Sequence, residues 1–255
     1  MTTNSQPKSS NKLLPWLDVI AITAWGILML KYWLTDKLNL LIHPDYFWLV
    51  ISGAIGLLVV GFLKGMQLRQ RRRITEVNNV QHFSLFPPGW GSGLLLITAI
   101  LGLLITPRVF SSQTALDRGV TELIGATRSQ PQAFRATIRP EERSLVDWVR
   151  TLNVYPEPDA YTGQKVKVQG FVIHPPEFSQ EHLFLARFII TCCAADAYPA
   201  GLPVKLSGSR DQYPPDTWLE VEGQMITETI VGKRHLTIDA KSLKKIPQPK
   251  NPYSY

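Results

Sequence analysis

Residues 13–34 read LLPWLDVIAITAWGILMLKYWL, and two further apolar stretches follow, YFWLVISGAIGLLVVGFL at 46–63 and GWGSGLLLITAILGLLIT at 89–106. A helix needs roughly 20 apolar residues to cross about 30 Å of hydrocarbon. Buried core helices seldom run this long without a charge, and tryptophan and tyrosine gather near the ends of these stretches, as they do at bilayer interfaces. We therefore expect a transmembrane domain at 13–106, with three helices at about these positions.

The first stretch could also be a cleaved signal peptide. Its apolar run is too long for one, it contains Trp16, Trp25 and Trp33, and no small-x-small cleavage site follows it. We expect the stretch to be retained, which makes the chain an integral, multi-pass membrane protein.

The basic residues predict the orientation of the helices, because Lys and Arg concentrate in short cytoplasmic loops. The connection between the first two stretches holds only Lys37, whereas the tail at 1–12, which we expect to be disordered, holds Lys8 and Lys12. We therefore expect a cytoplasmic N-terminus and an extracytoplasmic C-terminal domain. The connection between the second and third stretches carries the densest basic cluster: Lys64, Arg69, Arg71, Arg72 and Arg73.

Small residues form rows on two of the expected helices. Gly53, Gly61 and Gly65 share one side of the second helix, and Gly89 and Gly93 are four residues apart in the third. Such rows allow helices to approach closely. They either pack these helices on one another or dock them against a separate membrane protein, and the sequence leaves both open.

Beyond the apolar stretches the chain turns polar and divides into three parts. Residues 107–139 read as a linker, 140–246 as a folded extracytoplasmic domain, and 247–255 as a disordered tail, too proline-rich to fold. The domain is expected to begin with a helix whose first turn holds Pro140 and two acids. Its apolar face follows at helical spacing, with Leu145, Trp148, Val149 and Leu152.

From residue 163 the apolar period changes to two, which indicates β-strands. Gly170 in the first of them indicates a bulge or a tight bend. Five short strands separated by proline and glycine predict a small OB-like β-barrel, so the expected fold class is membrane α plus β. OB barrels often bind nucleic acid, but an extracytoplasmic position argues against that partner, and the cytoplasmic arginines account for much of the net charge of +7. The expected strands are 164–173, 184–192, 202–206, 218–226 and 236–241.

The only two cysteines, Cys192 and Cys193, are adjacent, and three interpretations stay open. Cys192 can be a packed core residue at a strand end. Alternatively, both thiols bind a transition metal such as zinc, together with Asp196 and with His174 or His182. As a third possibility, the pair forms a strained, labile disulfide. Neighbouring side chains on a strand point to opposite faces, so a shared ion requires the strand to end or bulge there.

Familiar catalytic motifs are missing from the sequence. It contains no CxxC, no phosphate-binding glycine loop, no HExxH and no GxSxG nucleophile elbow. We therefore expect that the protein is not an enzyme.

The segment RFIITCCAADAYP at 187–199, preceded by YTGQKVKVQGFV at 161–172, resembles the YcgQ-like family of membrane-permease subunits. The resemblance covers most of the chain: membrane helices, a linker and then a β domain. It implies a partner, a many-helix permease with which such proteins form a two-component complex. It implies no particular substrate.

These observations together predict an accessory subunit of a membrane permease complex, whose outer domain binds solute or metal or gates the partner. Two alternatives remain. One is a stand-alone membrane-anchored protein that handles metal or thiols, and the other is a ligand-free scaffold that binds another protein. The expected partners are the permease and the lipid bilayer, with no nucleic acid.

Overall fold

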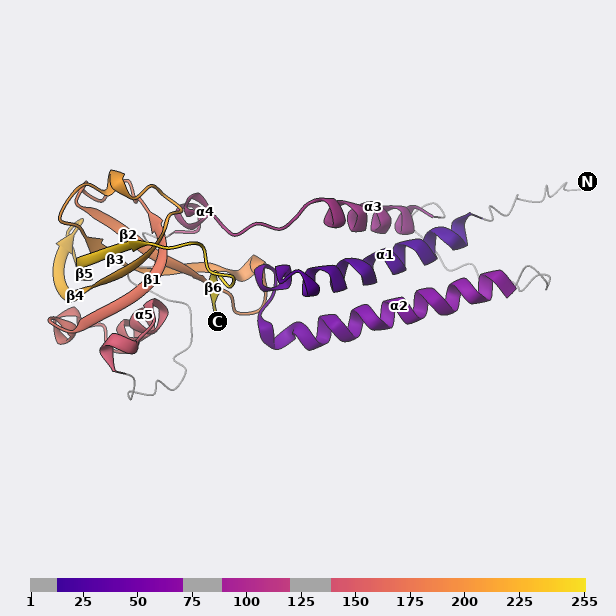
Figure 1. Cartoon of the computed structure of the whole chain (residues 1–255), viewed down its shortest axis with the longest axis horizontal. Helices are drawn as coiled ribbons and strands as arrows, with labels where there is room; N and C mark the ends of the chain where they lie inside the picture. The colour runs from indigo at the N-terminus through magenta and orange to yellow at the C-terminus, as the bar shows by residue number, and fades with distance from the viewer. Residues whose placement is uncertain (1–12, 71–88, 120–138) are drawn as a thin grey trace, which may run out of the picture. The chain divides into compact units, whose positions relative to one another are not determined.

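The computed structural model describes residues 13–70, 89–119 and 139–255, and the chain divides into two units (Figure 1). Unit 1 comprises residues 1–38 and 44–107, and unit 2 comprises residues 39–43 and 108–255. The N-terminal tail at 1–12 and the arginines at 71–73, on which the predicted orientation partly rests, lie outside the described residues.

Unit 1 consists of helices α1 (Leu14–Leu34), α2 (Phe47–Gln70) and α3 (Trp90–Leu104), and α1 packs against both of the others. Two helices, Leu14–Leu34 and the continuous helical stretch Pro44–Gln70, are long and apolar enough to cross a membrane. The third expected span is not confirmed. Its helix has 15 residues, or about 22 Å at 1.5 Å per residue, because Gly89 is left-handed at its start and Ile105 is extended at its end.

Polar groups of α1 bind the other helices of unit 1. The Trp25 indole donates to the carbonyl of Leu95 at 2.9 Å, and the Tyr32 hydroxyl donates to the carbonyl of Gly102 at 2.6 Å. Asp18 accepts a hydrogen bond from Ser92 and lies 3.8 Å from the Lys64 ammonium. In a bilayer the lipid is as apolar as the helix side chains, so the hydrophobic effect does not drive helices together, and hydrogen bonds of this kind add to van der Waals packing.

The glycine rows of unit 1 divide into two kinds. A Cβ placed on Gly61 would lie 2.5 Å from the Thr23 hydroxyl oxygen, so this glycine permits the close approach of α2 to α1. A Cβ placed on Gly53 or Gly93 would meet no atom within 4 Å. Gly61 therefore serves internal packing, whereas Gly53 and Gly93 face open space.

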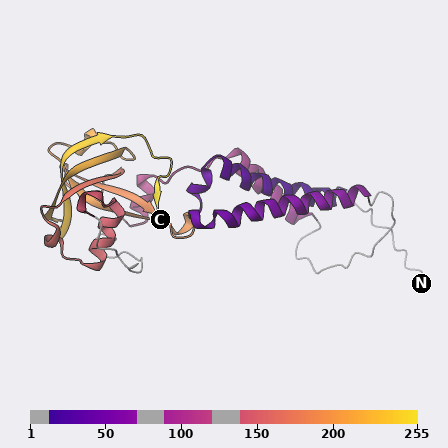
Figure 2. The same ribbon diagram turned by 60° about the horizontal axis from the view of Figure 1, so that its bottom comes forward.

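Unit 2 is built on a six-stranded sheet in the order β1-β4-β5-β3-β2-β6 (Figure 1). All five expected strands are present, with shifted ends. Because β1 pairs antiparallel with both β4 and β2, the pairing runs in a closed circuit through β1, β4, β5, β3 and β2, and the strands curve round a common core (Figure 2). The strands are β1 (Lys165–Ile173), β2 (His182–Ile189), β3 (Tyr198–Lys205), β4 (Trp218–Ile230), β5 (Lys233–Lys245) and β6 (Tyr253–Ser254).

Gly170 lies where β1 passes from one partner strand to the other. It pairs with Leu219 of β4, and an added Cβ would lie 2.7 Å from the carbonyl oxygen of Ala186 in β2. The expected bulge is found elsewhere, between Glu222 and Gly223 in the pairing of β4 with β5. Gly170 therefore permits close strand approach rather than an extra residue.

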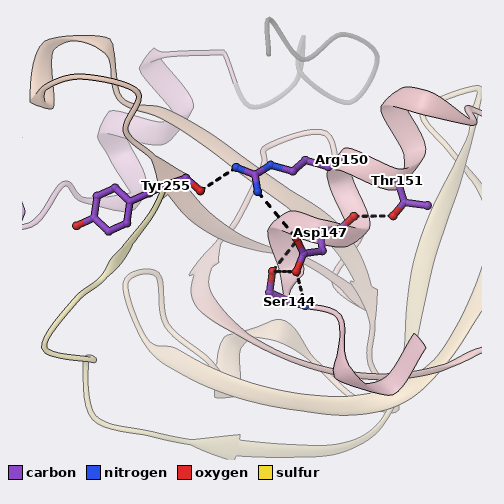
Figure 3. A network of polar contacts seen from close by, with 5 residues as sticks. All are labelled: Ser144, Asp147, Arg150, Thr151 and Tyr255. Carbon is purple, nitrogen blue, oxygen red and sulfur yellow. Dashed lines mark hydrogen bonds and ion pairs between the residues drawn. The ribbon is translucent and has the colours of Figure 1, made fainter. Parts of the chain in front are cut away.

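Helix α5 (Leu145–Val154) packs against β1, β2 and β3, and its Trp148 is fully buried. The helix begins at Leu145 and not at Pro140, because Ser144 caps it. The Ser144 hydroxyl accepts from the N–H of Asp147 at 3.1 Å, and the Asp147 carboxylate accepts from the Ser144 N–H (Figure 3). Pro140–Glu142 form a separate 3-10 turn.

The expected disorder of residues 247–255 is wrong. Tyr253 in β6 is 2% exposed, and its ring lies against those of Phe188 and Phe110. The main-chain oxygen of Tyr255 accepts from the Arg150 guanidinium at 2.8 Å (Figure 3). Two tyrosines thus fix a segment whose prolines alone suggested disorder. Likewise, part of the expected linker is folded: α4 (Ser112–Asp117) forms in unit 2, and Phe110 packs on its core.

Tyr253→Ala should therefore lower the free energy of unfolding of unit 2. Truncating a buried aromatic side chain removes apolar burial and leaves a cavity, at a cost of about 3 kcal/mol. Denaturant unfolding of the full chain in mild detergent, followed by near-ultraviolet circular dichroism, measures the loss. Tyr155→Ala is the control, because Tyr155 is 64% exposed. Equal stability of the two variants would mean that the tail does not contribute to the fold.

Candidate vicinal-dithiol site

The cysteine pair lies in a turn between two strands of unit 2. Strand β2 ends at Ile189, the 3-10 turn η6 spans Ala194–Asp196, and β3 begins at Tyr198. Cys192 is exposed and Cys193 is partly buried. The interpretation of Cys192 as a packed core residue is therefore wrong. The strand ends before Cys192, so the alternation of faces that would bury it no longer applies, and Ile190 is the last buried residue of this run.

The turn brings the two thiols and one carboxylate together. The Sγ atoms of Cys192 and Cys193 are 3.7 Å apart, and both cysteines are free. Ligand atoms of Cys192, Cys193 and Asp196 all lie within 4.8 Å of one another. The requirement that the strand end at the cysteines is met, and three of the four predicted ligands form one cluster.

Asp196 folds this turn through its carboxylate. Its oxygens accept the backbone N–H groups of Thr191 at 3.3 Å, Cys192 at 2.7 Å and Cys193 at 3.3 Å. Burial alone would raise the pKa of Asp196, but these bonds and one from the Cys192 thiol outweigh it and hold the pKa below its ordinary value. The carboxylate is therefore ionised at neutral pH.

The same carboxylate controls the Cys192 thiol. The hydrogen bond to Asp196, followed by the one to Cys193, raises the pKa of Cys192 from 9.0 to about 11. A thiol with so high a pKa is protonated at neutral pH and is a poor nucleophile. The Cys192 thiol is thus poorly suited to nucleophilic catalysis and to rapid oxidation.

One neighbour of the site, the segment at 39–43, was not predicted from the sequence. Ile42 and Cys193 form an antiparallel β-bridge. The His43 N–H donates to the Cys192 carbonyl at 3.0 Å, and the Ala194 N–H donates to the Leu41 carbonyl at 2.7 Å. No local sequence pattern predicts a bridge between positions so distant in the chain.

His174, the fourth predicted ligand, is not in the cluster. Its Nε2 lies 2.9 Å from the carbonyl oxygen of Tyr213, and burial lowers its pKa. The alternative, His182, hydrogen-bonds Ser179 at 2.8 Å and Glu228 at 3.0 Å. Within the described residues, neither histidine belongs to the group formed by the two cysteines and Asp196.

Asp196→Asn should speed the alkylation of Cys192. The substitution should return the pKa of Cys192 from about 11 toward 9.0, which raises the thiolate fraction by up to about 100-fold at about pH 8. A thiolate of lower pKa is intrinsically less nucleophilic, so the net gain in the alkylation rate is up to about tenfold. Iodoacetamide kinetics with mass-spectrometric localisation measure the rate. Glu177→Gln is the control, since it removes an exposed charge away from the turn. An unchanged or slower Cys192 rate in Asp196→Asn would contradict the role given to the carboxylate.

Comparison with known proteins places the chain in a family. A search of the curated proteins gives no match. The family model described as the DUF1980 C-terminal domain matches residues 127–255, which is more than half of the 255 residues and includes the sheet, α5 and the cysteine turn. The chain belongs to the DUF1980 C-terminal domain family.

Proposed function

We propose that the protein is a membrane-anchored accessory subunit whose unit 2 captures a transition-metal ion, such as zinc, at Cys192, Cys193 and Asp196. The separation of the two sulfurs carries this proposal. Two thiolates about 2.3 Å from a tetrahedral zinc ion lie about 3.8 Å apart, and the Sγ atoms stand at 3.7 Å. The turn therefore needs no rearrangement of the sulfurs to share one ion.

The donor set favours capture over a structural role. Structural zinc sites are closed by four protein ligands, whereas the cluster in the described residues offers three. The Asp196 carboxylate already accepts hydrogen bonds from backbone N–H groups. It therefore either binds the ion through a remaining lone pair, as the third ligand, or only holds the turn in the shape that presents the two thiols. Cys192 is exposed, which gives an ion or its carrier access to the open positions.

Membrane anchoring is supported by α1 and α2, which have the length and composition of membrane spans. The larger number of basic residues after α2 than between α1 and α2 supports a cytoplasmic N-terminus and an extracytoplasmic unit 2. The closed circuit of strand pairing supports an OB-like barrel for unit 2. In this proposal α3 is a shorter third membrane helix that a partner covers.

The resemblance to YcgQ-like permease subunits supports a many-helix permease as that partner. In such a complex the outer domain would hand its ion to, or gate, the partner. A stand-alone metal-handling protein would bind the ion without a stoichiometric permease, and a ligand-free scaffold would bind a partner without the ion. Metal binding and co-purification together separate the three.

The full chain in mild detergent should bind one Co²⁺, used as a spectroscopic substitute for Zn²⁺, with thiolate-to-metal charge-transfer absorption. Cys192→Ser and Cys193→Ser should each abolish this absorption, and Asp196→Ala should weaken binding. Affinity should rise between about pH 6 and about pH 8, by about tenfold per pH unit for each proton that the metal displaces from a thiol.

His174→Ala serves as the matched control for that titration. Its imidazole is bound to the Tyr213 carbonyl, so the variant should bind Co²⁺ as the unaltered chain does. Absence of charge-transfer absorption in the unaltered chain would reject metal capture. Loss of Co²⁺ binding in His174→Ala would contradict the ligand set proposed here and show that His174 contributes to the site.

Gly93→Leu should weaken co-purification with the permease, because Gly93 faces open space in unit 1 and a bulky side chain there blocks close helix approach. Gly61→Leu should instead destabilise unit 1 itself, because its side chain would collide with Thr23 of α1. Quantitative mass spectrometry of complexes isolated from native membranes measures the first effect, and thermal aggregation in detergent measures the second. Full retention of the partner by Gly93→Leu would show that this face of α3 is not the docking surface for the permease.

A further inference from the structure

Residues 39–43, which connect α1 to α2 along the chain, are part of unit 2. They contact the backbone of the dithiol turn on both sides of Cys193. The His43 N–H donates to the Cys192 carbonyl, and the Leu41 carbonyl accepts from the Ala194 N–H. These two bonds flank the bridge of Ile42 with Cys193. In such a non-hydrogen-bonded antiparallel pair the two side chains lie close together.

The other side of this segment is fixed by the C-terminal tail. The Tyr255 hydroxyl donates to the Asn39 carbonyl at 3.4 Å, and the Tyr255 ring meets the His43 ring edge-on at 4.8 Å. Leu40 is 7% exposed and belongs to an apolar core of unit 2. Arg150 holds the Tyr255 main-chain oxygen (Figure 3), so the tail that clamps the segment is itself anchored to α5.

The segment and the ion would thus bind the same two residues, the segment through their backbone and the ion through their side chains. The residues whose side chains would bind the ion, Cys192 and Cys193, have their backbone bonded to residues 41–43. The sulfurs stand at a chelating separation of 3.7 Å while the segment is docked. The chelating separation is thus observed with the segment docked, and a ligand that prefers the docked state shifts the population toward it.

We propose that metal binding at Cys192 and Cys193 and docking of residues 39–43 against the cysteine turn are thermodynamically coupled within unit 2. The proposal rests on the metal capture proposed above. Along the chain the segment follows α1, which ends at Leu34, and precedes α2, which begins at Phe47. Coupling is reciprocal: the ion stabilises docking by the same factor by which docking raises the affinity for the ion.

His43→Pro tests this coupling, because proline removes the N–H that bonds the Cys192 carbonyl. His43→Ala is the matched control, since it removes the imidazole and keeps the N–H. Both variants lose the ring contact with Tyr255, but only proline also loses the N–H, so Co²⁺ titrations of the full chain in mild detergent should give an affinity about tenfold weaker for His43→Pro than for His43→Ala, within the usual range of coupling. Ile42→Ala, compared with Ile42→Val, tests the contact with Cys193 without a change to the backbone.

Hydrogen–deuterium exchange measures the reverse direction, the effect of the ion on docking. Saturating Co²⁺ should slow exchange of the His43 and Ala194 amides by about the same factor, and Cys192→Ser should abolish this slowing. Absence of Co²⁺ binding would reject the proposed function, and the coupling with it. Co²⁺ binding with equal affinity in His43→Pro, His43→Ala and the unaltered chain, and with unchanged amide exchange, would reject the coupling alone.

Discussion

The double pairing of β1 is the constraint on which unit 2 depends. Residues 165–171 pair with β4 and residues 171–173 pair with β2, so Phe171 faces Trp218 in one pairing and Ala186 in the other. This exchange of partners closes the circuit of the five main strands and leaves β1 and β2 without the open ladder that an edge strand exposes. The end of β2 pairs instead with β3 and β6, where Ile189 lies opposite Tyr198 and Ser254. The dithiol turn thus begins where the pairing of β2 with β3 and β6 stops.

The strands could be predicted from the sequence where alternation is clean, as in β1, but their ends could not. Pro199 and Gly201 read as turn residues, yet both lie inside β3 opposite Phe188 and Ala186. Long-range pairing outweighs local propensity there. The tail shows the same effect, since the burial of Tyr253 outweighs the prolines before it. The length of α3 was overestimated because apolar composition continues past the point at which Ile105 becomes extended.

The candidate site could be predicted in part because three of its residues are neighbours in sequence. Asp196 lies three residues after Cys193, which is the spacing at which a carboxylate reaches back to the N–H groups that begin a helical turn. His174 was predicted on ligand type alone, and ligand type does not determine position. The segment at 39–43 could not be predicted, because the pairing of Ile42 with Cys193 depends on the folding of the whole of unit 2.

Asp196 makes the Cys192 thiol less reactive than an exposed cysteine would otherwise be. Oxidation and alkylation both proceed through the thiolate, and the pKa of about 11 at Cys192 keeps that form rare. A metal ion does not require a free thiolate in advance, since it displaces the proton as it binds. The carboxylate is also held by three backbone N–H groups, and none of these bonds involves the thiol proton. One side chain therefore folds the turn and, through the raised pKa of Cys192, slows the reaction of that thiol with reagents.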